Sequence, residues 1–335
     1  MQQWESDPAY KAVVRAFVDG DPQDQAGGPL DVRAVVAAIR PEAKDGFLVN
    51  EVPWDRFPEG REVRKRMERL RSGSIAAIRG ALDALGGLCA NDMRAAVAPA
   101  VPFLVRIGTD PSTGMRTEAL GVTAAAARVG YLGVCTRDRM LRPRGADEWL
   151  YEPTGYLANW SVQAARDAIA ADADLLLRLV DDPSPAVRIA ALYALAAASD
   201  RARDIRTAFH TRLLTEPSPA VRSALILAMA ELTRAHPAPE TVGWIRDQWS
   251  TPSRSPEVRV SAALGWMCLS DQPIPDRLRA MVNDLATDDM AELMAPLPWM
   301  RAAECADGDG LPRCMRAMLH PDAPDTGDGQ DDPWS

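Results

Sequence analysis

The sequence predicts an all-α fold, a right-handed α-α superhelix of about five to six helical hairpins with an N-terminal helical cap. The first observation is a repeat: "DDPSPAVRIAALYALA" at 181–196 returns as "TEPSPAVRSALILAMA" at 215–230, 34 residues later. The second is that an uncharged, Ala-rich run follows each Val-Arg pair. The third is that charged, amphipathic segments separate these runs. A period of this length is typical of stacked hairpins, each of which buries its apolar face against its neighbours.

Two further stretches carry the same pattern, "DPSTGMRTEALGVTAAAA" at 110–127 and "SRSPEVRVSAALGWMCL" at 253–269. The apolar residues before the arginines are spaced by 72, 34 and 37 residues and are Met115, Val187, Val221 and Val258. Pro and Ser before each apolar run end one helix and cap the next. The runs therefore indicate inner helices, and the amphipathic segments between them indicate outer helices.

An acidic residue in the turn stands six residues before the arginine in three of the copies. The pairs are Asp110 and Arg116, Asp182 and Arg188, and Glu216 and Arg222. A carboxylate and a guanidinium at this spacing can pair within a repeat or between repeats, and such pairs would fix the register of the array. In the fourth copy Ser253 replaces the acid opposite Arg259, so we expect one weaker pair there.

We expect three segments along the chain. Residues 1–58 form the helical cap, with helices at 8–17 and 29–40 joined by a loop rich in Gly, Pro and Asp. Residues 59–320 form the repeat array, interrupted by an insertion at about 131–158. Residues 321–335, with five aspartates, no basic residue and one aromatic residue, have the composition of a disordered tail.

Within the array, helical patterns predict six hairpins and a short closing helix, and proline residues break the second helix of the last hairpin. The hairpins lie at about 59–88, 95–129, 159–199, 200–235, 239–270 and 273–305, and the closing helix lies at 310–320.

The charge and the hydropathy pattern limit the possible partners and compartments. The net charge is −9, and a mildly acidic body argues against non-specific nucleic-acid binding, which needs a positive surface. No apolar stretch reaches the roughly 18 residues that a membrane span needs. The polar N-terminus does not resemble a secretion signal, and the five cysteines show no CxxC spacing. We therefore expect a cytoplasmic protein with reduced thiols.

The pattern of turn acid, Pro and "VR..A..AL" resembles HEAT repeats of the short bacterial kind. Three stretches are similar to uncharacterised actinobacterial HEAT-repeat proteins: "VPWDRFPEG", "AVAPAVPFLVRI" and "ANWSVQAARDAIAADADLLLRLVDDPSPAVRIAALYALA". The resemblance covers about residues 50–310. It implies the fold, whereas the wider HEAT group includes scaffolds, bilin lyases and DNA glycosylases, so it does not assign an activity.

The sequence contains no recognisable catalytic motif. The three histidines, His210, His236 and His320, are far apart and lack HExxH spacing, and there is no P-loop, GxSxG or GxGxxG. Cys305, Cys314 and His320 do not match the spacing of a common metal site. The sequence therefore predicts no metal site and no cofactor, and it leaves any catalytic residue unknown.

The inner helices predict a row of apolar side chains that faces the hollow of the superhelix. Counting from the arginines, these candidate groove residues are Ile189, Tyr193, Leu227, Val260 and Leu264. If the row is open, it is a candidate surface for a peptide or helix. The alternative is that close packing, or another part of the chain, covers it.

The insertion "RDRMLRPRGADEWLYEPTGYLANW" at 137–160 concentrates arginine and aromatic residues, the types that dominate binding hot spots. Insertions in solenoids emerge on one side and often carry function. The candidate binding residues are Arg142, Arg144, Trp149, Tyr151, Tyr156 and Trp160. The alternative is that these aromatic residues fold back to fill the groove or to join adjacent repeats.

Three functions follow from these observations. The favoured one is a scaffold or adaptor that binds a protein or peptide partner. An enzyme or a lyase-like protein that handles a chromophore or small molecule is the alternative, with Glu118, Glu231 and Cys268 as the inner-helix residues that could take part. Recognition of DNA lesions is least favoured because the inner helices carry no basic residues beyond the arginines of the repeat.

Overall fold

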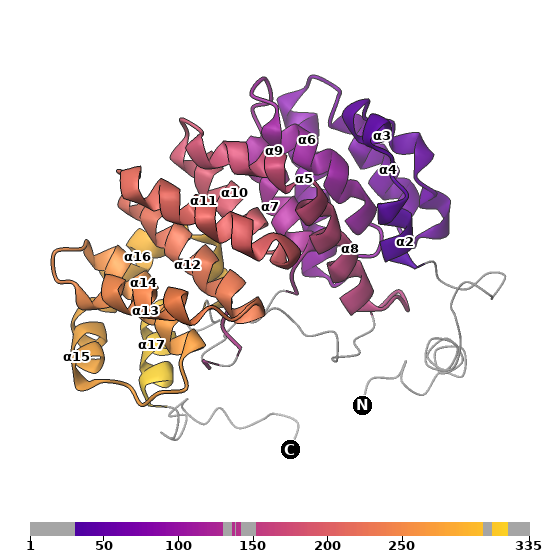
Figure 1. The fold of residues 1–335 in the computed structure, drawn as a ribbon. Helices are drawn as coiled ribbons and strands as arrows, with labels where there is room; N and C mark the ends of the chain where they lie inside the picture. The colour runs from indigo at the N-terminus through magenta and orange to yellow at the C-terminus, as the bar shows by residue number, and fades with distance from the viewer. Residues whose placement is uncertain (1–30, 130–135, 138, 142–151, 304–309, 321–335) are drawn as a thin grey trace, which may run out of the picture.

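The computed structural model describes residues 31–129, 136–137, 139–141, 152–303 and 310–320. In these ranges the regular secondary structure is entirely helical, and successive helices pack as pairs that stack into one array (Figure 1). The array runs from α2, α3 and α4 at one end to α15 and α17 at the other. The predicted class, an all-α helical solenoid, is confirmed. Every helix in the described ranges is too short or too polar to cross a lipid bilayer.

The helices before the insertion begin in the segment predicted as a cap. They are α2 (Val32–Ala37), α3 (Pro41–Asp45), η3 (Val49–Glu51), η4 (Trp54–Arg56), α4 (Gly60–Arg69), α5 (Ile75–Ala90), η5 (Ala98–Ala100), α6 (Val101–Thr109) and α7 (Arg116–Ala126). The helix expected at 8–17 lies outside the described residues, and so does the tail at 321–335. The division of the chain into a cap, a repeat array and an insertion remains a prediction.

The helices after the insertion contain the three most regular repeats. They are α8 (Ala158–Ala171), α9 (Ala173–Leu177), η6 (Arg178–Asp181), α10 (Pro185–Leu195), η7 (Ser199–Arg201), α11 (Ala202–Thr215), α12 (Pro219–Ala235), α13 (Pro239–Ser250), α14 (Pro256–Leu269), α15 (Asp276–Leu285), α16 (Asp288–Met294), η8 (Pro298–Ala302) and α17 (Gly310–Leu319). The short η8 follows α16 where Pro296 and Pro298 prevent a continuous helix.

The repeated Ser-Pro dipeptide starts the inner helices α10, α12 and α14. In each case the serine is the N-cap in an extended conformation and the proline occupies the first helical turn. Proline costs little there because the N–H it lacks would have no partner within the helix. Ser218 also accepts a hydrogen bond from the backbone N–H of Val221. Local turn chemistry therefore explains why these helices begin at equivalent positions.

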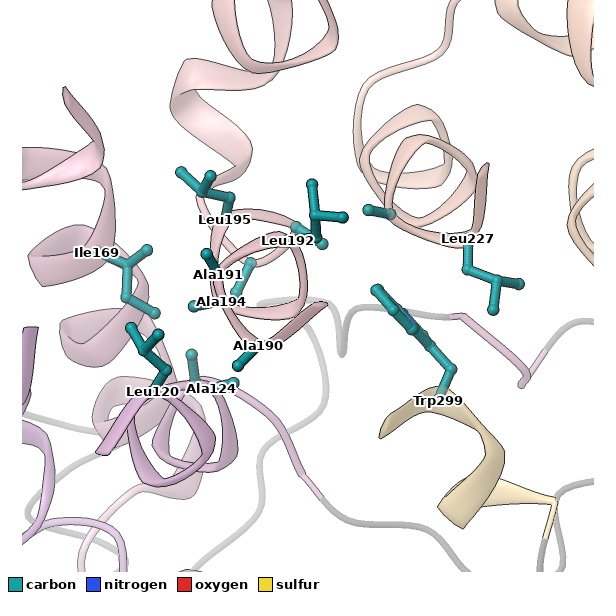
Figure 2. Close-up of a cluster of buried hydrophobic side chains, with 14 of the residues drawn as sticks. Leu120, Ala124, Ile169, Ala190, Ala191, Leu192, Ala194, Leu195, Leu227 and Trp299 are labelled. Atoms are coloured by element: carbon teal, nitrogen blue, oxygen red, sulfur yellow. The ribbon is translucent and has the colours of Figure 1, made fainter. Parts of the chain in front are cut away.

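Small side chains allow the inner helices to pack closely. Helices α7, α10, α12 and α14 contact one another in sequence. Figure 2 shows Ala190 and Ala194 of α10 beside Ala124 of α7. A Cβ atom added to Gly265 of α14 would lie 3.0 Å from the Cβ of Ala230 in α12, which is tighter than ordinary van der Waals contact, so a larger residue would require a shift of a few tenths of an ångström. The inner helices thus form the core, as their uncharged sequence predicts.

The arginines of the repeat pair with the acid of the following repeat. Arg116 binds Asp182 at 2.6 Å, and Arg188 binds Glu216 at 2.9 Å. Within its own repeat Arg188 instead donates to the backbone carbonyl of Asp182 at 2.7 Å. The ion pairs therefore join neighbouring hairpins and fix their register.

The forward pairing adds a second interrupted position to the one predicted at Arg259. Arg116 and Arg188 reach forward to the acid of the next turn. In the same register Ser253 occupies the position of the acid for Arg222. Within the described residues Arg222 forms no ion pair with an acid of the next turn. Arg259 donates to the backbone carbonyl of Trp249 at 3.3 Å. Arg259 therefore lacks an acid, as expected, and Arg222 is a second arginine of the repeat that forms no ion pair among the described residues.

Restoring the missing acid should stabilise the protein. We expect Ser253→Glu to form an ion pair with Arg222 and so to raise the free energy of unfolding by about 0.5–1 kcal/mol. The gain is modest because Ser253 is exposed and Arg222 is half-buried. Urea unfolding monitored by circular dichroism measures this change. The gain should disappear in an Arg222→Gln background, and an equal gain in both backgrounds would contradict the proposed pair.

Candidate functional site

One cluster of polar and aromatic residues joins distant parts of the array. We call it the Arg128 cluster, and it consists of Arg128, Arg166, Tyr193, Glu231 and Trp299. These residues come from the end of α7, from α8, α10 and α12, and from η8. Figure 2 shows Trp299 projecting from η8 toward α10 and toward Leu227 of α12. The cluster therefore lies where the sequence predicted an open groove.

The structure corrects the prediction that the groove residues form an open row. Leu227, Val260 and Leu264 are fully buried, and Ile189 is 8% exposed. Tyr193 is half-buried, and its ring meets the ring of Trp299 edge to face at a centroid distance of 4.8 Å. Packing between inner helices and cover by η8 together remove these side chains from water. The row is therefore covered by close packing and by another part of the chain, which was the alternative to an open groove.

Glu231 is held by two groups from different elements. Its Oε1 accepts from Arg128 Nε at 3.0 Å, and its Oε2 accepts from Arg128 Nη2 at 3.0 Å and from Trp299 Nε1 at 2.7 Å. The Arg128 guanidinium also lies 3.8 Å from the centroid of the Tyr193 ring. A bidentate pair with this additional hydrogen bond satisfies a carboxylate that is 7% exposed. Glu231 is thus already engaged by the chain itself.

Three arginines bind the carbonyl groups at the end of α7. Arg128 donates to Ala124 O at 3.2 Å, Arg166 donates to Ala127 O at 3.0 Å, and Arg94 donates to Arg128 O at 2.8 Å. Carbonyls of the last helical turn lack partners inside the helix, and positive charge there complements the helix dipole. The arginines therefore stabilise the point at which the chain leaves α7 for the insertion.

The predicted insertion residues fall into two groups. Arg142, Arg144, Trp149 and Tyr151 lie outside the described residues. Tyr156 is 5% exposed, its hydroxyl donates to Arg56 O at 2.8 Å, and its ring lies 5.8 Å from that of Phe57. Its assignment as a partner contact is therefore corrected, because it packs the end of the insertion onto the N-terminal segment.

Trp160, the last insertion candidate, lies in α8 and is half-buried. The guanidinium of Arg33 in α2 stands 4.1 Å from the centroid of its ring. Helices α2 and α8 pack against each other, so this cation–π contact belongs to their interface. Trp160 thus joins two elements of the chain, and a contact between Trp160 and a partner stays a prediction.

The beginning of the insertion contacts the C-terminal helices. Arg137 Nε donates to Met318 O of α17 at 3.0 Å. Arg234 of α12 donates to Met140 O at 3.1 Å and to Cys268 O of α14 at 2.7 Å. Together with η8, this short stretch ties the C-terminal helices to the middle of the array.

Glu152 is a buried carboxyl group that sequence reasoning missed. It is 1% exposed, and its Oε2 accepts hydrogen bonds from Ala95 N at 3.1 Å and Thr154 Oγ1 at 3.2 Å. Burial raises the pKa of Glu152 to about 7, while its hydrogen bonds and the charge of Arg94 oppose this rise. An acid in a loop that is rich in Pro and Gly looks solvated in the sequence, so no local signal indicates its burial.

The residues considered for catalysis are not assembled into a common site. Glu118 is exposed near the start of α7, whereas Glu231 is bound by Arg128 just beyond the other end of that helix. Cys268, the third candidate, lies in α14 and is buried, away from Glu118 near the start of α7. Among the described residues, no three His, Cys, Asp or Glu side chains are grouped so as to hold a metal ion.

Removing the indole of Trp299 should destabilise the fold. We expect Trp299→Ala to cost about 3 kcal/mol through the cavity it leaves, and Trp299→Phe to cost about 1 kcal/mol through loss of the hydrogen bond to Glu231. Urea unfolding measures both values. Trp244→Phe, at a half-buried position in α13, is the control and should change stability less. Equal costs for the two phenylalanine variants would contradict the role assigned to the Trp299 N–H group.

The stability of the protein should depend on pH through Glu152. Its pKa in the folded state, about 7, exceeds its ordinary value of 4.5, so the folded state keeps a proton that the unfolded chain releases. Stability from this group is therefore greatest below about pH 4.5 and falls by about 3 kcal/mol as the pH rises past 7.

Glu152→Gln should remove this loss, because its side chain stays neutral and can still accept from Ala95 N. The measurement is urea unfolding of both proteins at pH 5 and pH 8. Glu292→Gln, at an exposed position, is the control and should keep the wild-type difference between the two pH values. If Glu152→Gln keeps the wild-type difference in stability between pH 5 and pH 8, that difference arises from other titratable groups.

The comparisons with known proteins agree with this architecture. No curated protein matches the chain. The family of HEAT repeats matches residues 172–266, which begin at the N-cap of α9 and extend into α14. The wider resemblance to actinobacterial HEAT proteins stays a prediction. Residues 172–266, with inner helices α10, α12 and α14, are identified as HEAT repeats.

Proposed function

We propose that this protein is a scaffold or adaptor that binds a protein or peptide partner. Its repeats at 172–266 match HEAT repeats, which generally serve as protein-binding scaffolds. In such an array each hairpin adds surface without changing the fold of its neighbours. Repeat architecture therefore favours recognition of an extended partner.

The observation that carries this proposal is the binding of η8 by the inner helices. Trp299 places its ring against Tyr193, donates its N–H to Glu231, and is 5% exposed. Met300 beside it is also buried. A short segment with an aromatic anchor and one satisfied polar group is the kind of ligand that binding hot spots accept. The array thus already holds a peptide segment of its own chain.

The partner's contacts must differ from the row first predicted, because Leu227, Val260 and Leu264 are buried. We propose that the partner binds beside η8, where Arg301 is exposed, and extends to the insertion. The arginine and aromatic residues of the insertion, Arg142, Arg144, Trp149 and Tyr151, stay proposed contacts of the partner. Residue types typical of interface hot spots support this assignment.

The enzyme and lyase alternative has less support. It needs an acid or a nucleophile together with a second group in reach of a substrate. Glu152 has a perturbed pKa, but it is 1% exposed and its Oε2 is bound by the chain itself. Glu231 is occupied by Arg128 and Trp299. The described residues thus favour binding over catalysis.

Site-specific photo-crosslinking in the source cell tests the proposed function. Arg301→p-benzoylphenylalanine places the probe beside η8, and Leu214→p-benzoylphenylalanine places it on outer helix α11, where Leu214 is 86% exposed. We expect one defined protein adduct from position 301 and none from position 214. Adducts of the same protein from both positions, or from neither, would contradict a partner surface beside η8.

A further inference from the structure

Arg166 differs from its neighbour Arg128 in how its guanidinium is used. The Nε, Nη1 and Nη2 atoms of Arg128 all donate, to Glu231, Ala124 O and Tyr193 O. Arg166 donates only its Nε–H, to Ala127 O at 3.0 Å. A guanidinium carries five N–H groups. Among the described residues, the four N–H groups on the Nη atoms of Arg166 have no acceptor.

The Arg128 cluster contains more positive than negative charge. Its two guanidinium groups, Arg128 and Arg166, face one carboxylate, Glu231. Both oxygens of that carboxylate are occupied by Arg128, and one also accepts from Trp299. Asp167 follows Arg166 in α8, but it is exposed and accepts from Gln163 at 2.6 Å. The charges of Glu231 and Asp167 act on Arg166, but within the cluster Arg166 is the guanidinium that has no carboxylate hydrogen-bonded to it.

The surroundings of Arg166 make the missing carboxylate costly. The side chain is half-buried, and burial together with the charge of Arg128 lowers the pKa of Arg166 to about 10. A charge that is partly removed from water without a partner is unfavourable. Capping the end of α7 needs one N–H group only, so it accounts for the Nε atom and not for the rest of the guanidinium. An anion at the Nη atoms would offset the cost.

We propose that the guanidinium of Arg166 is a binding site for a carboxylate group. Two parallel N–H groups of arginine match the two oxygens of a carboxylate. A single negative charge would pair with the guanidinium of Arg166. A doubly charged phosphate would bring a second negative charge close to Glu231. The site goes beyond the proposed scaffold function, because a small organic acid and a carboxylate of a peptide satisfy it equally.

Thermal unfolding of the full chain in sodium acetate and in sodium chloride at equal ionic strength tests the site. We expect acetate to raise the melting temperature with a saturating dose response, and chloride to raise it less. Arg166→Gln should weaken acetate binding by about tenfold or more, since it removes the charge and the paired donors. Equal effects of the two salts, or unchanged acetate binding in Arg166→Gln, would overturn the proposal.

Three controls keep this result specific. Arg246→Gln, at an exposed arginine of α13, should bind acetate as the wild type does. Arg166→Lys keeps the charge but not the paired donors, and should weaken binding while the protein still unfolds cooperatively. Inorganic phosphate should bind more weakly than acetate, and tighter binding of phosphate would overturn the assignment to a carboxylate.

A last comparison distinguishes the two sources of the carboxylate. Acetyl-Ala-Ala with a free carboxyl terminus is compared with its amide and with acetate. Tighter binding of the acid than of acetate, with no binding of the amide, would support a peptide carboxylate. Equal binding of the acid and acetate would support a small organic acid. Binding of the amide as tight as that of the acid would overturn the site.

Discussion

The ion pair between Arg128 and Glu231 is the contact around which the covered inner face is arranged. It joins the end of α7 to α12 across 103 residues of sequence, and it brings Tyr193 of α10 under the guanidinium. A buried carboxylate must have its oxygens satisfied, and Trp299 supplies the remaining donor. One buried ion pair thus links three inner helices to one another and to the segment that covers them.

Arginine connects the array in two chemically distinct ways. In the repeats it reaches forward to the turn of the next hairpin, as Arg116 and Arg188 do. At the end of α7 it binds backbone carbonyls, where Arg94 and Arg166 arrive from other elements. Lysine, with a single ammonium group, could not serve several acceptors in one plane in the same way.

Sequence reasoning succeeded where the determining interactions are local. The Ser-Pro starts of α10, α12 and α14 depend on neighbouring residues, and the uncharged runs indicate burial directly. It failed for Leu227 and Tyr193 because their cover, Trp299, is more than 70 residues away in the chain. No periodic pattern links a proline-broken C-terminal segment to the middle of an array. The burial of Glu152 has the same origin, since Ala95 lies 57 residues before it.

The close contact between Gly265 and Ala230 has a geometric consequence for the whole molecule. These two positions set how near α14 can come to α12. In a solenoid the small rotation from one hairpin to the next is repeated, so it determines the bend and pitch of the complete array. A methyl group at Gly265 would require α12 and α14 to give way by a few tenths of an ångström, and the helices that follow α14 would share that shift. The absence of a side chain at Gly265 therefore helps to decide where the far end of the protein points.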